Sequence, residues 1–552
     1  MSFITKTKGG LVHGFLNSSR AFLIGTGLLA SSIAALSPVA AQAEMVLNRG
    51  NGAEPGSLDP QISEDVPASH ILRDLFEGLV GEEPSGKIVP GEAESWKISK
   101  DGLTYTFKIR DDAKWTNGEP VTAGDFVYAW QRAVDPKTGS EYSFLLSPIK
   151  NADDITSGKM APKELGAKAI DDKTLEVSLA GPTPYFLGLL THSISYPVNK
   201  AAVEKFGDQW TRPGNSVTNG AFKLDEWNPQ SRIVLSKNDS YWNADSVKLD
   251  KVIYYPTEST TAELKRFRAG ELDWTYEVPN DQIKWIRDNM NDEFVVSNYL
   301  GVYYYGFNMT KPPFDNAKLR EAFSLAINRD ILMDKIVTAG EVPAYAYVVP
   351  GMTGYKPVYA DFKDMTQKER NEKAYKLYQE AGYSKDNPVT VEIRYNTNDN
   401  HKKIAIAIAS MWKSVFGAQV NLVNEEFKVF LETRKAKEKT QVFRAGWIGD
   451  YNDPNTFLEL WKSDSGLNDT GFADPEFDKL MKEASNEQDS EKRMELLRNA
   501  EEIFLKANAV APIYHYVTKH MIKSYVKGWD ADGKGHVNVM DHVRSQYLWI
   551  DK

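Results

Sequence analysis

A cation, an indole and a carboxylate lie close together in residues 444–455, which read RAGWIGDYNDPN. They belong to Arg444, Trp447 and Asp450. A carboxylate can bind an ammonium group and a guanidinium can bind a carboxylate, so this set could hold both ends of a small zwitterion against an aromatic wall. Asp, Asn, Gly and Pro are also common turn formers. The stretch by itself therefore leaves two interpretations open, a ligand-binding segment or simply a turn.

The elements around this stretch favour ligand binding. From residue 317 onward the hydrophobic pattern predicts an alternation of helices and strands. The predicted helices cover residues 317–339, 366–381, 401–416, 427–436, 475–484 and 491–507, and the predicted strands cover residues 389–395, 420–423, 441–447 and 509–516. Asp450 thus follows the end of a strand, which is where open α/β sheets usually bind ligands.

The sequence pattern in the first half of the chain predicts an arrangement that differs from the helix and strand alternation after residue 317. In residues 103–110 (LTYTFKIR) apolar and polar side chains alternate, which is typical of a strand with one buried face. Thr122 and Asp125 form a capping-box pattern that begins a helix. Residues 80–200 therefore indicate one α+β unit. The apolar, β-prone residues 299–308 (YLGVYYYGFN) indicate a central strand that carries the chain between two lobes.

The first 43 residues have the features of an export signal. Three basic residues precede an apolar run at residues 21–35, and residues 41–43 (AQA) have the small-x-small form that signal peptidase needs. An uncleaved anchor is the alternative, but the apolar run is short for a membrane span. We expect cleavage after Ala43 and a mature protein in a periplasm.

Composition narrows the classes of function. The 552-residue chain has a net charge of −10, and residues 1–43 hold three basic and no acidic side chains, so the mature chain would carry −13. We therefore expect no nucleic acid partner. The chain has no cysteine, which excludes disulfides, thiol catalysis and cysteine-bound metals. The 26 Tyr and 13 Trp favour recognition surfaces, although a large core would also use them.

No familiar catalytic motif occurs in the sequence. A GxSxG nucleophile elbow, a Walker loop and an HExxH motif are all absent. His515 and His520 are five residues apart on a predicted strand and should face opposite sides, so they do not suggest a shared metal. His401 begins a predicted helix, where an exposed terminal residue is the simplest expectation. We therefore expect neither an enzyme nor a metal or cofactor site.

An ordered set of short segments resembles the oligopeptide-binding proteins of bacterial ABC importers, within the extracellular solute-binding proteins. In the first half these segments are SLDP (57–60), RDLFEGL (73–79), DAKWTNGEPVTAGDFVYAW (112–130), KAIDDKTLEV (168–177), VTNGAFKL (217–224) and SYWN (240–243). In the second half they are YYYGFN (303–308), RNEKAYKLYQEAGY (370–383), YNTNDNHKK (395–403) and RAGWIGDYNDPNTF (444–457). SYWN alone is a weak signal, whereas the ordered set is specific.

The resemblance implies an α/β architecture. This is the two-lobed periplasmic binding protein fold of type II, cluster C, with an extra α+β domain inserted in lobe one. On this chain, lobe I would comprise residues 44–76, 202–300 and 517–552. The extra domain II would cover residues 77–201, and lobe III residues 301–516. Closure of two such lobes would bury a ligand and create a surface that a permease can read.

The resemblance also implies roles for individual residues. Asp450 matches the aspartate that pairs with the α-ammonium of a bound peptide, in the same RAGWxxDYN context. Positions that meet the carboxylate of peptides of different length fall on Arg434, Arg444 and His401. The other expected peptide contacts are Glu64, Tyr142, Phe427, Gly446 and Trp447.

Two features depart from the family. Phe427 stands where close relatives carry a tryptophan, which keeps an aromatic wall but removes an N–H donor. Gly301 and Ile448 replace two cysteines that some relatives pair as a disulfide close to the site. Neither departure changes the expected fold.

The expected function is a monomeric periplasmic receptor that delivers short peptides with a free amino terminus to the permease subunits of an ABC importer at the inner membrane. Strand edges can satisfy a peptide backbone, and wet pockets can accept many side chains. Within the same fold, relatives also take dipeptides, murein tripeptides, nickel chelates or haem. The sequence leaves murein tripeptide open as a ligand. A periplasmic peptidase and a chaperone-like binder are the alternatives from other classes.

Overall fold

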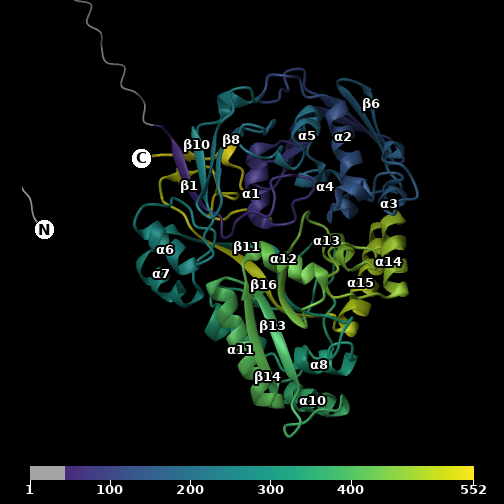
Figure 1. Ribbon diagram of the computed structural model, residues 1–552, viewed down its shortest axis with the longest axis vertical. Helices are drawn as coiled ribbons and strands as arrows, with labels where there is room; N and C mark the ends of the chain where they lie inside the picture. The colour runs from purple at the N-terminus through teal and green to yellow at the C-terminus, as the bar shows by residue number, and fades with distance from the viewer. Residues whose placement is uncertain (1–43, 353) are drawn as a thin grey trace, which may run out of the picture. The chain divides into compact units, whose positions relative to one another are not determined.

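The computed structural model describes residues 44–352 and 354–552 (Figure 1). The predicted export signal, residues 1–43, lies outside these ranges. Residues 44–552 form one compact unit that contains one six-stranded and two four-stranded sheets. Within the described ranges, no helix is long and apolar enough to cross a membrane.

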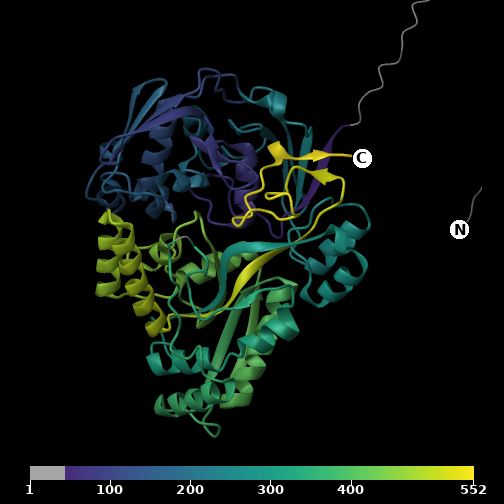
Figure 2. The same cartoon turned by 180° about the vertical axis from the view of Figure 1, so that it is seen from behind.

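The largest sheet has six strands in the order β12-β16-β11-β15-β13-β14. Its strands are β11 (Phe294–Phe307), β12 (Val342–Pro343), β13 (Thr390–Asn396), β14 (Gln419–Glu425), β15 (Val442–Ile448) and β16 (Val510–Met521). β13 pairs in parallel with β14 and β15, whereas β11 pairs antiparallel with β15 and β16. Figures 1 and 2 show the long strands β11 and β16 side by side. The predicted central strand at residues 299–308 is the second half of β11.

Helices pack against this sheet through large apolar side chains. They are α8 (Ala317–Leu325), α9 (Arg329–Leu332), α10 (Gln367–Glu380), α11 (Asp399–Phe416) and α12 (Phe427–Ala436). Phe323 lies between Trp412 and Phe416, with ring centroids 4.6 and 5.0 Å away. These rings belong to one buried cluster that also contains residues of β11 and β13. The expected α/β alternation is therefore present after residue 317.

One predicted helix is interrupted. The pattern predicts a single helix over residues 317–339, but α8 ends at Leu325 and α9 begins only at Arg329. The Asn328 side chain accepts the backbone N–H of Ile331 at 3.1 Å and so begins a new helix by capping it. A short π-helical turn then ends this segment. The prediction of one continuous helix is wrong because apolar spacing does not reveal a capping Asn inside the run.

A second sheet has four strands in the order β1-β10-β9-β8. Its strands are β1 (Val46–Gly50), β8 (Phe222–Asn228), β9 (Arg232–Lys237) and β10 (Lys251–Tyr255). The helices near it in the chain are α1 (Val66–Leu75), α5 (Lys200–Phe206), α6 (Thr260–Arg268) and α7 (Ile283–Asn289). Tyr254 of β10 donates a hydrogen bond to Asp74 of α1 at 2.7 Å, which ties this helix to the sheet.

A third sheet is antiparallel and has the order β4-β5-β7-β6. Its strands are β4 (Ala93–Ile98), β5 (Thr104–Ile109), β6 (Ala167–Asp171) and β7 (Thr174–Ser178). Tyr105, Phe107 and Ile109 are buried, as the alternation predicts. Helix α2 (Ala123–Val134) begins with the predicted capping box of Thr122 and Asp125.

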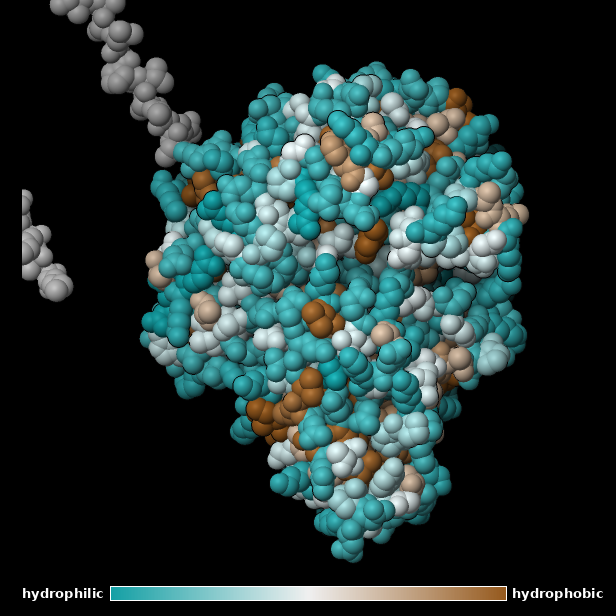
Figure 3. Space-filling view, viewed as in Figure 1, coloured by the Kyte–Doolittle hydropathy of each residue, from teal (hydrophilic) through white to brown (hydrophobic). Residues whose placement is uncertain are grey.

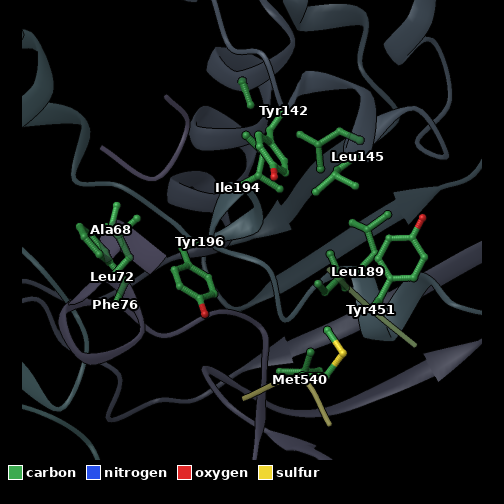
Figure 4. Packing of buried hydrophobic residues seen from close by; sticks show 14 of the residues in the cluster. Ala68, Leu72, Phe76, Tyr142, Leu145, Leu189, Ile194, Tyr196, Tyr451 and Met540 are labelled. Carbon is green, nitrogen blue, oxygen red and sulfur yellow. The ribbon is translucent and has the colours of Figure 1, made fainter. Parts of the chain in front are cut away.

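The two four-stranded sheets share one apolar core, which extends into the loop after β15. Figure 4 shows part of this core, with Tyr142 and Leu145 near Ile194 and with Leu189 beside Tyr451. The loop after β15 is therefore packed against the core of the first half of the chain.

The remaining strands and helices are short, except for α14 and α15. They are β2 (Val80–Glu82), β3 (Ile88–Pro90), β17 (Val526–Lys527), β18 (Trp549–Ile550), α3 (Ala152–Thr156), α4 (Phe186–Leu189), α13 (Asn455–Leu458), α14 (Pro475–Asn486) and α15 (Ser490–Ala507). The face drawn in Figure 3 is mainly hydrophilic, with hydrophobic residues in small groups.

Candidate functional site

A cavity of about 240 Å³ is enclosed by the six-stranded sheet, α12 and segments from the first half of the chain. The structure places all nine residues singled out in the sequence on its wall. They are Glu64, Tyr142, His401, Phe427, Arg434, Arg444, Gly446, Trp447 and Asp450. The fold therefore gathers at one place residues that are widely separated in the chain.

Asp450 follows β15, and its side chain is buried. Thr456 Oγ1 accepts the Asp450 backbone N–H at 3.0 Å and lies 3.4 Å from Asp450 Oδ2. Burial raises the pKa of Asp450 to about 8, and the bond to Thr456 and the charge of Arg73 oppose part of this rise. Among the described residues, no lysine or arginine forms an ion pair with Asp450. The carboxyl group is therefore suited to an ammonium group supplied from outside.

His192 is the imidazole nearest to Asp450, with 3.5 Å between Nε2 and Oδ1. Its Nδ1 accepts the backbone N–H of Ile194 at 3.2 Å, so in the neutral ring Nε2 carries the proton and faces the carboxyl group. Burial and the charge of Arg73 lower the pKa of His192 to about 3. His192 is therefore neutral at physiological pH and does not supply the missing cation.

The loop that carries Asp450 is fixed by its neighbours. Arg493 of α15 donates from Nη1 and Nη2 to the two carboxylate oxygens of Asp453, each at 2.8 Å. The ring of Tyr451 stacks on that of Tyr185, with centroids 4.9 Å apart. The loop is thus held by a bidentate ion pair on one side and by aromatic stacking on the other.

Aromatic rings form one wall of the cavity. The ring of Tyr142 stacks on Trp447, with centroids 6.0 Å apart, and on His192, with centroids 4.9 Å apart. Trp447 Nε1 is buried and has no hydrogen-bond partner among the described residues. Phe427 begins α12 and adds a further ring. This wall offers flat apolar contact and one N–H donor to a ligand.

Arg444 of β15 is half-buried, with its Nε atom fully buried, and it forms no ion pair with a carboxylate in the described part of the chain. Its Nη2 donates to the Tyr516 hydroxyl at 2.8 Å and its Nη1 donates to Asn396 Oδ1 at 3.3 Å. The guanidinium also lies 4.8 Å from the centre of the Tyr303 ring. Burial acts to lower the pKa of Arg444, but the neighbouring tyrosines outweigh it and raise the pKa. A ligand carboxylate would complete this environment.

His401 lies near the start of α11 and is buried rather than exposed. The simple expectation of an exposed residue is wrong because the start of α11 packs against the segment before β11, where the Asn400 side chain donates to the Val278 carbonyl at 3.0 Å. Burial, together with the charges of Arg444 and Lys519, holds the pKa of His401 well below its ordinary value. Its Nδ1 has no hydrogen-bond partner among the described residues.

Arg434 and Glu64 lie together at the end of the cavity near α12. Arg434 forms an ion pair with Asp469, so its charge is already compensated within the protein. Burial raises the pKa of Glu64 to about 7, and the charge of Arg434 opposes this rise. Next to them, Lys435 forms an ion pair with Glu141. Arg434 is therefore less available to a ligand carboxylate than an arginine without an acidic partner.

Two glycines, one in β15 on the cavity wall and one in β11 behind it, are closely approached by neighbouring side chains. A Cβ atom on Gly446 would lie 2.6 Å from the Tyr516 hydroxyl and 3.4 Å from Arg444 Nη2, so only glycine leaves room for the bond between those two side chains. Gly301 and Ile448 face each other across β11 and β15. A Cβ on Gly301 would lie 2.5 Å from Ile448 Cδ1, so the isoleucine fills the space between these two positions.

Several cavity residues were not found from the sequence. They are His70, Arg73, His192, Tyr276, Glu277, Tyr299, Tyr516, Lys519, His520 and Asp541. Lys519 and His520 carried a signal, because ionisable residues inside an otherwise apolar strand are seldom buried without a role or a partner. The others had no local signal. Among the described residues, no group of three or more His, Asp or Glu side chains is arranged to hold a metal ion.

Comparison with known proteins assigns the chain to a family. Residues 87–469 match the family described as bacterial extracellular solute-binding proteins, family 5 Middle. The periplasmic oligopeptide-binding protein OppA of Salmonella typhimurium is 43% identical over 547 residues, covering 97% of this chain and 99% of the relative.

Two solved structures share the fold. The murein tripeptide binding protein MppA of Escherichia coli has a TM-score of 0.90 at 38% identity, covering 93% of this chain and 99% of that one. The Haemophilus influenzae OppA complex with the peptide RPPGFSPFR has a TM-score of 0.89 at 39% identity, covering 93% and 100%. The expected two-lobed type II binding protein fold is therefore confirmed. With a match over most of its length and relatives this similar, the chain belongs to family 5 of the bacterial extracellular solute-binding proteins.

Proposed function

We propose that this protein is a periplasmic receptor that encloses short oligopeptides and delivers them to the permease of an ABC importer. The observation that carries this proposal is an unpaired strand edge. β13 pairs with β15 only at Val442 and Phe443, while β11 covers the whole of the other edge. Within the described chain, no strand pairs with the remaining edge of residues 444–448, most of which line the cavity. An extended peptide can add to such an edge through backbone hydrogen bonds.

The two ends of this edge carry complementary charges for a peptide. Asp450 would bind the α-ammonium group, and Arg444 would bind the carboxylate of a peptide of suitable length. Six residue steps separate them, which corresponds to at most roughly 20 Å of extended chain and so to a ligand of no more than about six residues. Arg434 and His401 would meet the carboxylate of peptides of other lengths.

The remaining predicted contacts would enclose the ligand without selecting one sequence. Tyr142, Trp447 and Phe427 would cover its side chains, Glu64 would lie near the end of α12, and Gly446 would allow close approach of the peptide backbone. Flat rings and polar groups joined by water can accept side chains of many kinds. This supports broad rather than narrow specificity.

The division into lobes follows the sheets. Residues 44–76 and 202–300 contain the strands β1, β8, β9 and β10, and residues 77–201 contain the sheet of β4 to β7. Lobe III would cover residues 301–516, and residues 517–552 would return to lobe I. Because β11 begins at Phe294 and β16 ends at Met521, the two connections between lobes would lie inside paired strands, which suits a hinge.

The names of similar proteins support the proposed location and partners. The similar OppA is a periplasmic protein by name. Residues 1–43 would be the export signal, cleaved after Ala43. The receptor would act as a monomer. The permease subunits at the inner membrane would recognise the closed, loaded form.

A murein tripeptide receptor is the second candidate. The TM-score of 0.90 with the murein tripeptide binding protein favours it, and such a ligand also has a free amino group and carboxylates. A peptidase role is less well supported because the family consists of solute-binding proteins. Incubation with a labelled peptide followed by chromatography would reveal cleavage.

Mass spectrometry of bound ligands tests the proposal. The mature protein is purified from periplasm without refolding and denatured in acid, and the released small molecules are identified. A mixture of short peptides with free amino termini is the expected result. A single species such as a murein tripeptide would favour the second candidate, and the absence of any peptide after loading with a tripeptide library would overturn the peptide receptor.

A further inference from the structure

A group of basic and imidazole side chains forms a part of the cavity wall that the proposed peptide clamp does not use. His70 and Arg73 come from α1, His520 comes from β16, and Asp541 and His542 come from the segment near the C-terminus. All five side chains are buried. They therefore line a part of the cavity with little water, where electrostatic interactions with a charged ligand group would be strong.

Arg73 makes no direct contact with an acidic side chain in the part of the chain that the structure describes. Among the described residues its guanidinium makes neither an ion pair nor a hydrogen bond, although only 8% of the residue is exposed. Glu82, whose charge acts on Arg73, lies 2.6 Å from His542 Nδ1, and Asp541 lies 3.2 Å from His520 Nε2. The charge of Arg73 also acts on Asp450, but the two side chains form no ion pair. A buried guanidinium without a partner is costly, so a ligand anion would relieve this cost.

His520 lies on the same part of the cavity wall and is already paired within the protein. Its Nδ1 lies 3.0 Å from the Thr275 carbonyl oxygen, which can only accept a hydrogen bond, and its Nε2 faces the Asp541 carboxylate. Both ring nitrogens are therefore already engaged within the protein. Asp541 is consequently not available to balance Arg73.

His70 is the second side chain without partners. It is 2% exposed, and neither ring nitrogen has a hydrogen-bond partner among the described residues. Its ring centre lies 5.9 Å from that of Tyr276. Burial lowers the pKa of His70 well below its ordinary value, and the charges of Arg49 and Arg73 lower it further. His70 is thus a neutral donor in a positive field, which favours an anion.

The pocket adjoins the proposed ammonium site. The charge of Arg73 acts on both Asp450 and His192, so the guanidinium lies within electrostatic reach of the place where the amino terminus of a ligand would bind. In an amino acid, the side chain branches from the carbon that bears the ammonium group. Arg73, His70 and Asp450 line the same cavity, so a side chain on the first residue of a ligand would be within reach of this part of the wall.

We propose that Arg73 and His70 form a subsite that binds an anionic side chain, such as that of glutamate, on the amino-terminal residue of the ligand. This inference rests on the proposed peptide-binding function and adds a preference to it. The simpler alternative is that Arg73 only balances the charge of Asp450, in which case a neutral first residue would bind equally well.

Isothermal titration with two matched tripeptides separates these possibilities. Glu-Ala-Ala and Gln-Ala-Ala have nearly the same shape and differ in one charge, so their affinity ratio reports the subsite alone. We expect the wild-type protein to bind Glu-Ala-Ala on the order of tenfold more tightly. Arg73→Met should reduce this ratio to near one, and His70→Phe should reduce it in part. Arg232→Met, which removes an exposed arginine outside the cavity, should leave the ratio unchanged.

The outcomes distinguish the inference from the function on which it rests. Equal wild-type affinities for the two peptides would overturn the subsite while leaving the peptide receptor intact. A preference that persists in Arg73→Met would also overturn it. If neither tripeptide binds to the wild-type protein, the proposed function itself fails. Equal wild-type affinities would refute the subsite even if a variant does not fold.

Discussion

Asp450 owes its proposed role to its surroundings. An exposed aspartate gains little from a surface ion pair, because water screens the interaction. In the cavity the same group is buried with a pKa near 8, next to a neutral imidazole and without a basic partner among the described residues. An ammonium group that enters this place would replace the lost water and hold the carboxyl group in its ionised form.

The affinity for unblocked peptides should therefore depend on pH. Because the pKa of Asp450 is raised to about 8 in the empty cavity, a proton must leave before the ammonium group can bind, and affinity should fall below pH 8 by up to about tenfold per pH unit. Above pH 8 the peptide amine, whose ordinary pKa is about 8, loses its own proton and affinity should fall again.

Titration calorimetry of a tripeptide between pH 5.5 and 9 would check this expectation. The matched control is Asp450→Asn, which keeps the shape of the side chain and should flatten the acidic limb. An acidic limb of equal slope in Asp450→Asn would show that another group titrates.

Arg444 should act on the opposite end of the ligand. Arg444→Met keeps most of the apolar stem but removes the guanidinium, and we expect it to weaken peptides with a free carboxylate by about 1.5–3 kcal/mol. Peptide amides, which lack that charge, should lose much less. Comparing each peptide with its amide on both proteins isolates the effect. Equal losses for the two ligands would mean that Arg444 supports the Tyr516 hydroxyl and not the ligand.

At the scale of elements, the site depends on how the exit of β15 is held. β11 and part of β13 fix the strand, and α15 fixes the loop beyond it through the bidentate pair of Arg493 and Asp453. The Arg493 side chain is 3% exposed, so removing it would leave a buried carboxylate without its partner. The position of Asp450 is therefore maintained by a helix that contributes nothing to the cavity wall.

Arg493→Met should lower the free energy of unfolding by roughly 3–5 kcal/mol, since breaking a buried pair leaves an uncompensated charge. Urea unfolding followed by circular dichroism would measure the change. Lys506→Met on the same helix removes an exposed lysine paired with Glu502, and it should change the stability by no more than about 0.5 kcal/mol. Similar effects of the two substitutions would contradict the supporting role of Arg493.

Local patterns predicted many of these elements. Alternation in residues 103–110 predicted β5, the capping box at Thr122 predicted the start of α2, and apolar spacing predicted α10 to α12. The helix predicted over residues 317–339 failed, because Asn328 caps a second helix inside an apolar run. Such a break depends on backbone hydrogen bonds that periodicity does not report.

The site itself was predictable only in part. Residue types and spacing singled out Arg444, Trp447 and Asp450 but left that stretch as a turn or a ligand-binding segment. The other six predicted site residues on the cavity wall were named through the family resemblance. His192 and Arg73 were missed because the cavity residues around them lie far away in the chain. The ion pair between Arg434 and Asp469 could not be predicted either, because the two residues are far apart in the chain and no local sequence pattern indicates their contact.

At the scale of the whole molecule, contacts between segments on either side of the cavity help to enclose it. Lys435 forms an ion pair with Glu141. The ring of Tyr185 stacks on that of Tyr451, and the guanidinium of Arg493 lies 4.9 Å from the centre of the Tyr185 ring. These contacts join residues of the proposed domain II to residues of the proposed lobe III. We expect these contacts to separate when a peptide enters or leaves, which would couple binding to closure.

The most direct test of the account compares a tripeptide and its N-acetylated form on wild-type protein and Asp450→Asn by titration calorimetry. The account predicts that Asp450→Asn weakens the unblocked peptide by roughly 2–5 kcal/mol, because the buried ammonium loses its partner, and changes the affinity of the acetylated peptide little. Equal losses for both peptides, or a wild-type protein that binds the acetylated form as tightly as the unblocked one, would contradict the central claim that the cavity recognises the free amino terminus of a peptide through Asp450.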